Sequence, residues 1–253
     1  MIIRTIKTEK LTGRNKGLFD FVDKYIKKLD EKSVVVLTSK IISILEGRVM
    51  KKEGIPKADL IAAESDQYLV YENEYWHKDF VLSIKNNLLI PNGGIDESNA
   101  FDNYILWPKD PYGTAKKLWK YWKDKFKLKN LGVIITDSKT TPMRWGTTGV
   151  SIGYCGFSGL NSYIGKNDIF GKKMEITKAN IADGLAAAGV VAMGEGKEQT
   201  PIAIITGFEN IKFKKTATSK SEIKNFSIAM NEDIYSPLLM GVKWIKGGVS
   251  NRT

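Results

Sequence analysis

The hydrophobic and polar positions of this chain predict alternating strands and helices of ordinary globular length. Short runs rich in β-branched residues predict strands at residues 2–6, 34–38, 132–136 and 201–207. Apolar residues at helical spacing predict helices at residues 18–26, 57–65, 116–127 and 179–193. A further element at 40–48 ends near Gly47, and the aromatic segment 66–101 is strand-like. The pattern predicts a mixed α/β (α+β) fold without internal repeats or a regular βαβ ladder.

The predicted helix at 179–193 consists largely of alanine, glycine and other small residues. An interior glycine costs about 1 kcal/mol of helix propensity relative to alanine. We therefore expect Gly184 and Gly189 to serve close packing against a neighbouring element. Beyond the last predicted strand, residues 247–253 are expected to form a fraying tail.

Composition narrows the class of protein. The chain has 253 residues, of which 42% are hydrophobic and 26% charged, as is typical of a globular protein. Its apolar runs are too short to span a bilayer and its amino terminus lacks a signal-peptide pattern, so we expect a cytoplasmic protein with no membrane partner. The single cysteine, Cys155, excludes an intrachain disulfide and a multi-thiolate zinc site, and is expected to be buried and inert. The single histidine, His77, excludes a histidine metal cluster and is expected to be structural or exposed.

The net charge of +11 raises the question of nucleic-acid binding. Basic residues are densest in the predicted helix 116–127, where lysines cover one face. The apolar residues of this helix form a stripe on the other face: Leu118, Tyr121, Trp122 and Phe126. This pattern favours an amphipathic surface helix over a phosphate-binding face, so nucleic acid is the least favoured partner.

Candidate chemistry is concentrated in two loops that follow apolar runs. Residues 91–99 combine a Pro-Asn-Gly-Gly turn with the polar side chains of Asp96 and Asn99. The strand predicted at 132–136 is followed by an Asp-Ser pair at 137–138. Acidic oxygens delivered by such turns suit a hard divalent cation. The pairing of the two loops predicts a metal site that handles phosphate.

Two further segments carry candidate phosphate or carboxylate contacts. The turn at 193–197 offers Glu195 for a metal and Lys197 for phosphate, although its glycine spacing is not that of a phosphate loop. A helix C-cap would explain Gly194 equally well. Arg144 lies in a loop bounded by proline and glycine, where a guanidinium could clamp phosphate or carboxylate; an ordinary surface arginine is the alternative.

Residues 91–99, with the sequence PNGGIDESN, resemble the NAGIDxSN signature of the coenzyme F-420 γ-glutamyl ligase family. Residues 106–111, LWPKDP, are similar to the family's LLPxDPD, and Ser43 with residues 46–48 resembles its VSKAEGR. Shorter matches occur at residues 135–138, 142–144, 150–153, 167–172, 182–183, 191–194 and 206–207. The resemblance covers most of residues 34–207, and the ordered set of motifs is specific.

The resemblance implies a GTP-dependent ligase that uses Mg²⁺ or Mn²⁺, at one or two sites, to join L-glutamate to a carboxylate acceptor through an acyl phosphate. It implies a two-domain mixed α/β fold, with mixed and antiparallel sheets, that forms an intertwined homodimer. We place the nucleotide-binding domain at residues 1–75 plus 178–253, and an inserted metal and substrate domain at residues 76–177. The acceptor is left open between the deazaflavin coenzyme, a folate, as in folate-type γ-glutamate ligases, and another γ-glutamylated acid.

The resemblance also implies roles for individual residues. Asp96 and Asp137 would hold one metal ion, and Ser138 and Glu195 would hold a second. Asp96 and Asp137 together with Arg144 form the predicted catalytic set. The predicted nucleotide contacts are Ser39, Lys40, Asn99, Met193, Gly194, Gly196 and Lys197.

The chain departs from the family pattern at several positions. Ile44 stands where the family has lysine, with Lys40 as a candidate substitute, and residues 140–142, Thr140-Thr141-Pro142, stand where the family has GRP, so that one arginine is lost. Gly149 and Gly184 each replace a carboxylate. We therefore infer a retained nucleotide and metal core. A non-catalytic nucleotide-binding relative is the alternative to the ligase.

Overall fold

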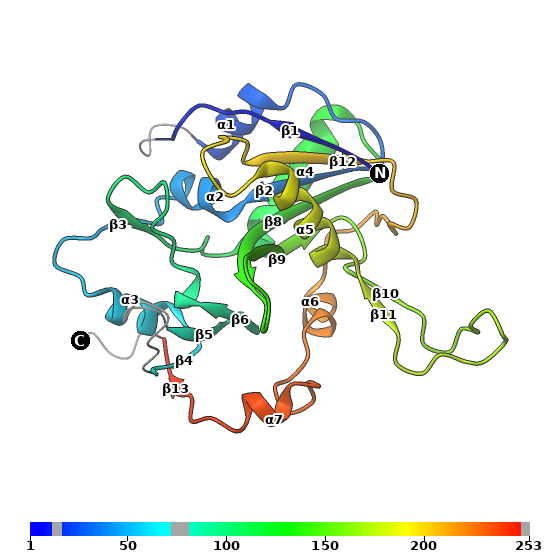
Figure 1. Ribbon diagram of the computed structural model, residues 1–253. Coiled ribbons are helices and arrows are strands. Elements are labelled where there is room, and N and C mark those ends of the chain that lie inside the picture. Colours follow the sequence, from blue (N-terminus) through cyan, green and yellow to red (C-terminus); the bar gives the residue numbers. More distant parts are fainter. Residues whose placement is uncertain (12–16, 72–80, 249–253) are drawn as a thin grey trace.

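The computed structural model describes residues 1–11, 17–71 and 81–248, and within these residues the chain builds a central sheet of five strands (Figure 1). The strand order is β1-β12-β2-β8-β9, in which β2 and β8 are parallel and the other neighbours antiparallel. The strands are β1 (Ile2–Ile6), β2 (Ser33–Thr38), β8 (Leu131–Thr140), β9 (Thr147–Cys155) and β12 (Ile202–Thr206). The strands predicted at residues 2–6, 34–38, 132–136 and 201–207 are confirmed as β1, β2, β8 and β12.

Helices cover both faces of this sheet, and Figure 1 shows α5 in front of it and α4 behind it. In β2, Val35 and Leu37 belong to a core that also contains residues of α1 and α4, whereas Val34 and Val36 pack with α5. The three helices are α1 (Leu18–Tyr25), α4 (Pro111–Phe126) and α5 (Ile181–Met193). A strand buried on both faces reads as a continuous apolar run, which explains why β2 lacks alternation in the sequence.

The predicted basic helix is confirmed as α4 and begins earlier than the sequence indicated. The Asp110 side chain accepts a hydrogen bond from the Gly113 amide at 2.8 Å, and proline occupies the first helical position. Leu118 and Trp122 are fully buried, as the apolar stripe predicted. On the other side, Lys125 forms an ion pair with Asp23 at 2.6 Å. α4 is therefore an amphipathic helix docked on the sheet.

The small residues of α5 allow it to lie very close to the sheet. A methyl group on Gly189 would lie 3.0 Å from Cγ1 of Val36, and one on Gly149 of β9 would lie 2.5 Å from the backbone oxygen of Ala186. Gly184 faces open space instead. The expected packing role is thus confirmed for Gly189 and is wrong for Gly184, because Gly184 lies on the exposed side of the helix.

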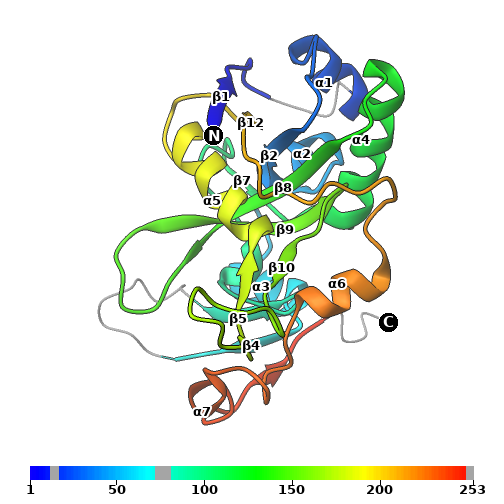
Figure 2. The same cartoon turned by 90° about the vertical axis from the view of Figure 1, so that its right-hand side faces the viewer.

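A second sheet lies below the first (Figures 1 and 2), and in the described part of the chain it has the order β13-β4-β5-β6. Its strands are β4 (Gln67–Leu69), β5 (Leu82–Lys85), β6 (Leu88–Pro91) and β13 (Ile245–Lys246). The helix α3 (Lys57–Glu64) contributes Leu60 and Ile61 to the small core beside this sheet. The helix predicted at 57–65 is confirmed. Residues 72–80, and with them the prediction for His77, lie outside the described residues.

The carboxy-terminal segment differs from the fraying tail that the sequence predicted. β13 pairs with β4, and the Gly247 amide donates a hydrogen bond to the Asp66 backbone oxygen at 2.9 Å. A methyl group on Gly247 would lie 2.2 Å from the backbone oxygen of Ser65. The prediction is wrong at Gly247 because this backbone is packed against α3 and hydrogen-bonded; residues 249–253 lie outside the described residues.

The remaining elements connect and extend the two sheets. They are α2 (Ser39–Leu45), β3 (Val49–Lys51), the 3-10 turn η1 (Asn92–Gly94), β7 (Asn103–Ile105), β10 (Leu160–Ser162), β11 (Lys178–Asn180), α6 (Lys220–Phe226) and α7 (Ser236–Leu239). β3 pairs with β7, and β10 pairs with β11 at the base of an arm that projects from the body (Figure 1). α2 is the element predicted at 40–48.

The mixed α/β class with mixed and antiparallel sheets is confirmed. The division into residues 1–75 plus 178–253 and residues 76–177 stays a prediction; the central sheet takes strands from both of these units. Cys155 is a buried free thiol, as expected, and its burial raises its pKa.

Among the helices of the described residues, none combines the length and the apolar character that crossing a membrane requires.

Candidate active site

A cavity of about 760 Å³ lies where the carboxyl end of β2 meets several loops. Its lining comes from the ranges 8–11, 38–44, 91–101, 136–138 and 190–201. The predicted site residues in this lining are Ser39, Lys40, Asp96, Asn99, Asp137, Ser138, Met193, Gly194, Glu195, Gly196 and Lys197. The structure therefore gathers segments that are far apart in the sequence around one hollow.

The loop that carries Asp96 is shaped by consecutive residues with left-handed backbone, Asn92, Gly93 and Gly94, whose φ angles are 54°, 61° and 72°. Gly94 lies directly against the buried indole of Trp107, because a methyl group on this glycine would lie 2.3 Å from Nε1 of the ring. Only glycine combines a positive φ with so close an approach. The Pro-Asn-Gly-Gly turn thus packs the start of the acidic loop directly against the Trp107 indole.

Asp96 is held by a cation from α2 and by its own loop. Lys40 Nζ lies 2.7 Å from Asp96 Oδ2 and donates hydrogen bonds to the Ser98 backbone oxygen at 2.8 Å and to its hydroxyl at 2.9 Å. The other oxygen of Asp96 accepts the Ser98 amide at 2.7 Å. Ile44 lines the same cavity one helical turn further along α2. Lys40 therefore supplies a cation within the region where the family lysine is lost.

Asp137 lies in a strand, where the sequence predicted a loop. β8 continues to Thr140 because β9 pairs with it throughout, with a register shift between Ile135 and Thr136. This bulge interrupts the regular alternation of side chains just before Asp137, and such bulges re-aim side chains near functional sites. The correction leaves Asp137 in the cavity lining, on a rigid strand instead of a loop.

Both carboxylate oxygens of Asp137 have hydrogen-bond donors. The Ser39 hydroxyl donates to Oδ1 at 3.0 Å, and the indole N–H of Trp107 donates to Oδ2. Burial raises the pKa of Asp137 to about 6, although these two donors and the backbone amide of Ser138 act in the opposite direction. The negative charge of Asp96 raises this pKa further. The carboxylates of Asp96 and Asp137 thus line the same cavity and repel each other electrostatically.

The turn after α5 contacts β8 and the acidic loop. Glu195 Oε1 accepts hydrogen bonds from the Ser138 hydroxyl at 2.7 Å and from the Thr147 hydroxyl at 3.2 Å. The Asn99 side-chain amide donates to the backbone oxygen of Gly196 at 3.2 Å. Hydrogen bonds therefore connect the two residues predicted for the second metal, Ser138 and Glu195, and connect Asn99 to Gly196, two of the residues predicted for the nucleotide.

The donor set suits a divalent cation that is shared with phosphate. In the described part of the chain, no three Asp, Glu, His or Cys side chains converge on one point. The carboxylates instead come as Asp96 near Asp137, and as Glu195 beside Ser138. A cation would offset the burial of Asp137 and the nearby charge of Asp96, the two effects that raise the pKa of Asp137. Mg²⁺ is ordinarily bound through one or two carboxylates plus substrate phosphates, so the residues present fit such an ion.

Arg144 is the one predicted catalytic residue that the structure does not bring to the cavity. It is exposed near the tip of the β8–β9 hairpin, where its amide donates to the Thr141 backbone oxygen at 3.2 Å. Thr140 and Thr141, which replace the first two residues of the family's GRP, are exposed in the same hairpin. At Gly149, by contrast, the backbone of α5 fills the space that a carboxylate would need.

Sequence reasoning missed several residues that hold the site. Trp107, which is 1% exposed, entered only as one letter of a motif. A buried tryptophan gives no sequence signal that separates a core role from a site role. Thr147 likewise gave no signal. The match of residues 46–48 to the family pattern was the available hint for Arg48, whose guanidinium donates to the Trp107 backbone oxygen at 3.0 Å.

Fold and cavity define a mixed α/β protein whose oxygen-rich hollow is suited to a cation-bound phosphate. Comparison with known proteins is more specific, since residues 13–207 match the family described as F420-0:Gamma-glutamyl ligase. The chain is 30% identical to the coenzyme F420:L-glutamate ligase of Methanocaldococcus jannaschii over 79% of this chain and 84% of that protein. It is 33% identical to the enzyme of the same name from Methanococcus maripaludis strain C7, over 74% of this chain and 80% of that protein. The enzyme of that name from Archaeoglobus fulgidus is 33% identical over 71% of this chain and 77% of its own length.

The chain belongs to the F420-0:gamma-glutamyl ligase family. It is accordingly an enzyme of the amide-bond-forming ligase class.

Proposed function

We propose that this protein is a GTP-dependent ligase that joins the amino group of L-glutamate to a carboxylate of a coenzyme F420 precursor, with Mg²⁺ or Mn²⁺. The observation that carries the proposal is the convergence of Lys40, Asp96, Asp137 and Glu195 from four separate segments on one cavity. The names of the relatives supply the acceptor, since each is called a coenzyme F420:L-glutamate ligase.

The reaction consists of two displacements. An oxygen of the acceptor carboxylate attacks the γ-phosphorus of GTP, the bond to the β-phosphate oxygen breaks, and GDP leaves with the electron pair. The amino nitrogen of glutamate then attacks the acyl carbon of the resulting acyl phosphate. Inorganic phosphate leaves and the nitrogen releases its proton to solvent. Catalysis of phosphoryl transfer consists mainly of positioning and charge stabilisation.

The cavity residues supply these two functions. Lys40 and Lys197 bring positive charge to the cavity lining, where they would contact the phosphates of GTP. Asp96 and Asp137 would hold one cation, and Glu195 with Ser138 a second; a bound cation neutralises charge on phosphate oxygens. Arg144 is the least supported member of the predicted catalytic set, because it is exposed in the hairpin and does not line the cavity.

We also propose that the chain acts as a homodimer. The β10–β11 arm carries Ile169, Phe170 and Ile176, which are 91%, 88% and 86% exposed. Large apolar side chains gathered on one projecting arm are typical of an interaction site. Light scattering coupled to gel filtration should give twice the chain mass, and Phe170→Asp should shift the mass towards that of the monomer. A monomeric wild type would exclude the dimer.

The nucleotide site is tested by calorimetric titration of GTP, and of ATP, with Mn²⁺ and then with EDTA. We expect metal-dependent binding that prefers GTP in the wild type and its loss in Asp96→Ala and Asp137→Ala. Asp124→Ala is the matched control, because Asp124 is an exposed carboxylate on α4 and does not line the cavity. Wild-type affinity for GTP in both cavity variants would contradict the proposal. Release of GDP and phosphate that requires both glutamate and the acceptor then tests the ligase reaction.

A further inference from the structure

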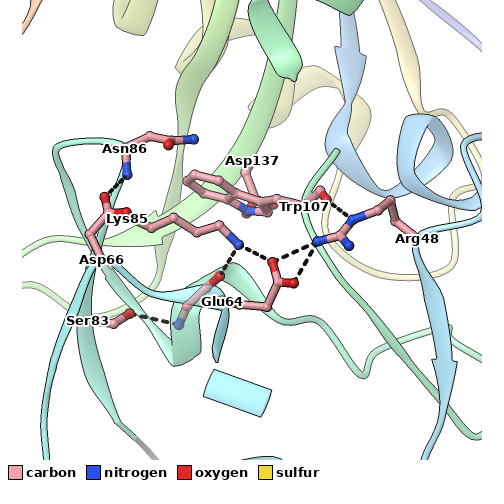
Figure 3. A network of polar contacts seen from close by, with 9 residues as sticks. Arg48, Glu64, Asp66, Ser83, Lys85, Asn86, Trp107 and Asp137 are labelled. Atoms are coloured by element: carbon pink, nitrogen blue, oxygen red, sulfur yellow. Dashed lines mark hydrogen bonds and ion pairs between the residues drawn. The ribbon is translucent and has the colours of Figure 1, made fainter. Parts of the chain in front are cut away.

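Trp107 connects the cavity to a buried group of charges beneath it (Figure 3). The indole N–H donates to Asp137, whereas the backbone oxygen of the same tryptophan accepts the Arg48 guanidinium at 3.0 Å. The ammonium of Lys85 lies 5.3 Å from the centre of the indole ring, over its face. Gly94 packs directly against the indole at its Nε1 edge. The tryptophan is therefore fixed on several sides, and the one polar atom of its side chain, Nε1, donates to a cavity carboxylate.

The charges that fix Trp107 are themselves joined by Glu64. Both oxygens of Glu64 accept hydrogen bonds from Arg48 Nη2 at 2.7 Å, and Lys85 Nζ lies 2.8 Å from Oε2 (Figure 3). Lys85 also donates to the backbone oxygen of Gly93, in the turn that precedes Asp96. The buried charge cluster, defined as Arg48, Glu64 and Lys85, thus contacts both Trp107 and the acidic loop.

We propose that Trp107 is a positioning residue for Asp137 and that the buried charge cluster acts on the site through Trp107. The inference rests on the proposed function in so far as Asp137 is taken to hold a cation. The indole N–H on Oδ2, the Ser39 hydroxyl on Oδ1 and the backbone amide of Ser138 occupy three of the roughly four lone-pair sites of the Asp137 carboxylate, which leaves one site for a cation. Partners of this kind fix the orientation of a ligand carboxylate, and their loss typically weakens metal binding about 10-fold to 100-fold.

Packing alone does not account for this tryptophan. A buried indole N–H usually has a hydrogen-bond partner. The N–H of the fully buried Trp122 has none among the described residues, whereas that of Trp107 donates to a carboxylate in the cavity lining.

The contact is tested by ¹⁵N–¹H spectra of the tryptophan indoles in the full-length protein. The Trp107 resonance is assigned by its loss in Trp107→Phe and should shift in Asp137→Asn. We expect it to shift also in Glu64→Gln and to stay in place in Asp23→Asn. Asp23 is the matched control because it too is contacted by a lysine and an aromatic side chain away from the cavity: it forms an ion pair with Lys125 and accepts a hydrogen bond from Tyr121. An unmoved Trp107 resonance in Glu64→Gln would overturn the proposal.

The consequence for the site is tested by Mn²⁺ binding, measured by electron paramagnetic resonance without substrates. Trp107→Phe should weaken binding about tenfold or more, and Glu64→Gln should weaken it in the wild-type background but by less than about twofold when Trp107 is already phenylalanine. Wild-type affinity in Trp107→Phe, or an equal effect of Glu64→Gln in both backgrounds, would overturn the proposal. If Glu64→Gln does not fold, Arg48→Lys carries the same comparisons. If the wild type binds neither Mn²⁺ nor GTP, the proposed function fails, while the indole spectra still decide whether the cluster positions Trp107.

Discussion

Two groups of opposite charges flank the candidate site, and their carboxylates differ in how deeply they are buried. In the buried charge cluster, the side chains of Glu64 and Lys85 are 18% and 11% exposed, and that of Arg48 is 29% exposed. In the cavity pair, the side chains of Asp96 and Lys40 are 36% and 24% exposed. Glu64 is contacted by two cations at 2.7 and 2.8 Å, whereas Asp96 is contacted by one at 2.7 Å.

The difference shows which charges can respond to a ligand. Breaking a buried pair leaves a charge without compensation, which is costly, whereas an exposed pair exchanges partners with water at little cost. If phosphate and a cation bind as proposed, Lys40 is free to turn from Asp96 towards the phosphate, and Asp96 is free to turn towards the cation. Glu64 has no such freedom, so the buried charge cluster provides a rigid support and the cavity pair provides the adaptable part.

The largest effect is expected from removing the carboxylate of the buried charge cluster. Glu64→Ala leaves Lys85 and Arg48 without their shared anion and should lower the free energy of unfolding by about 3–5 kcal/mol. Urea denaturation followed by circular dichroism measures this difference, with Asp124→Ala as the control for loss of an exposed carboxylate. A loss below about 1 kcal/mol would mean that the cluster is no more important for stability than a surface ion pair.

An intermediate effect is expected from acid. Burial tends to raise the pKa of Glu64, but Lys85 and Arg48 outweigh it and hold this pKa below its ordinary value of 4.5. A depressed folded-state pKa means that the stabilisation is fully present above the unfolded-state pKa and is lost as the pH falls through the folded-state pKa. The stability difference between wild type and Glu64→Gln should therefore be constant above about pH 5.5 and narrow below the ordinary glutamate pKa. A difference that does not change on acidification would contradict the depressed pKa.

The smallest effect on stability is expected at the cavity pair. Lys40→Ala should change the free energy of unfolding by less than about 1 kcal/mol, because its partner Asp96 remains accessible to water and to the Ser98 donors. The same variant should weaken GTP binding, because it removes a cation from the cavity lining. Parallel urea and GTP titrations separate the two. A stability loss like that expected for Glu64→Ala would erase the distinction between the two groups.

Much of the fold follows from local pattern. Buried strands such as β2 and β12 are short runs of β-branched residues, which the sequence pattern identifies. The small residues of α5 correctly predicted its close contact with the sheet at Gly189. The sequence pattern did not predict the first residues of α4, because Pro111 is typical of a turn. In the structure, Asp110 caps the helix and Pro111 occupies its first position.

The sequence by itself determined the mixed α/β class, the acidic loop of residues 91–99 and the family, since these depend on neighbouring residues and ordered motifs. Only the tertiary structure decided that Arg144 is exposed in a hairpin, that Asp137 lies in a strand, and that Trp107 donates to it. The physical reason is separation along the chain. Glu64 and Lys85 are 21 positions apart, and Arg48 and Trp107 are 59 apart. Contacts between residues so far apart depend on how the two sheets pack together, and no local pattern of residues encodes them.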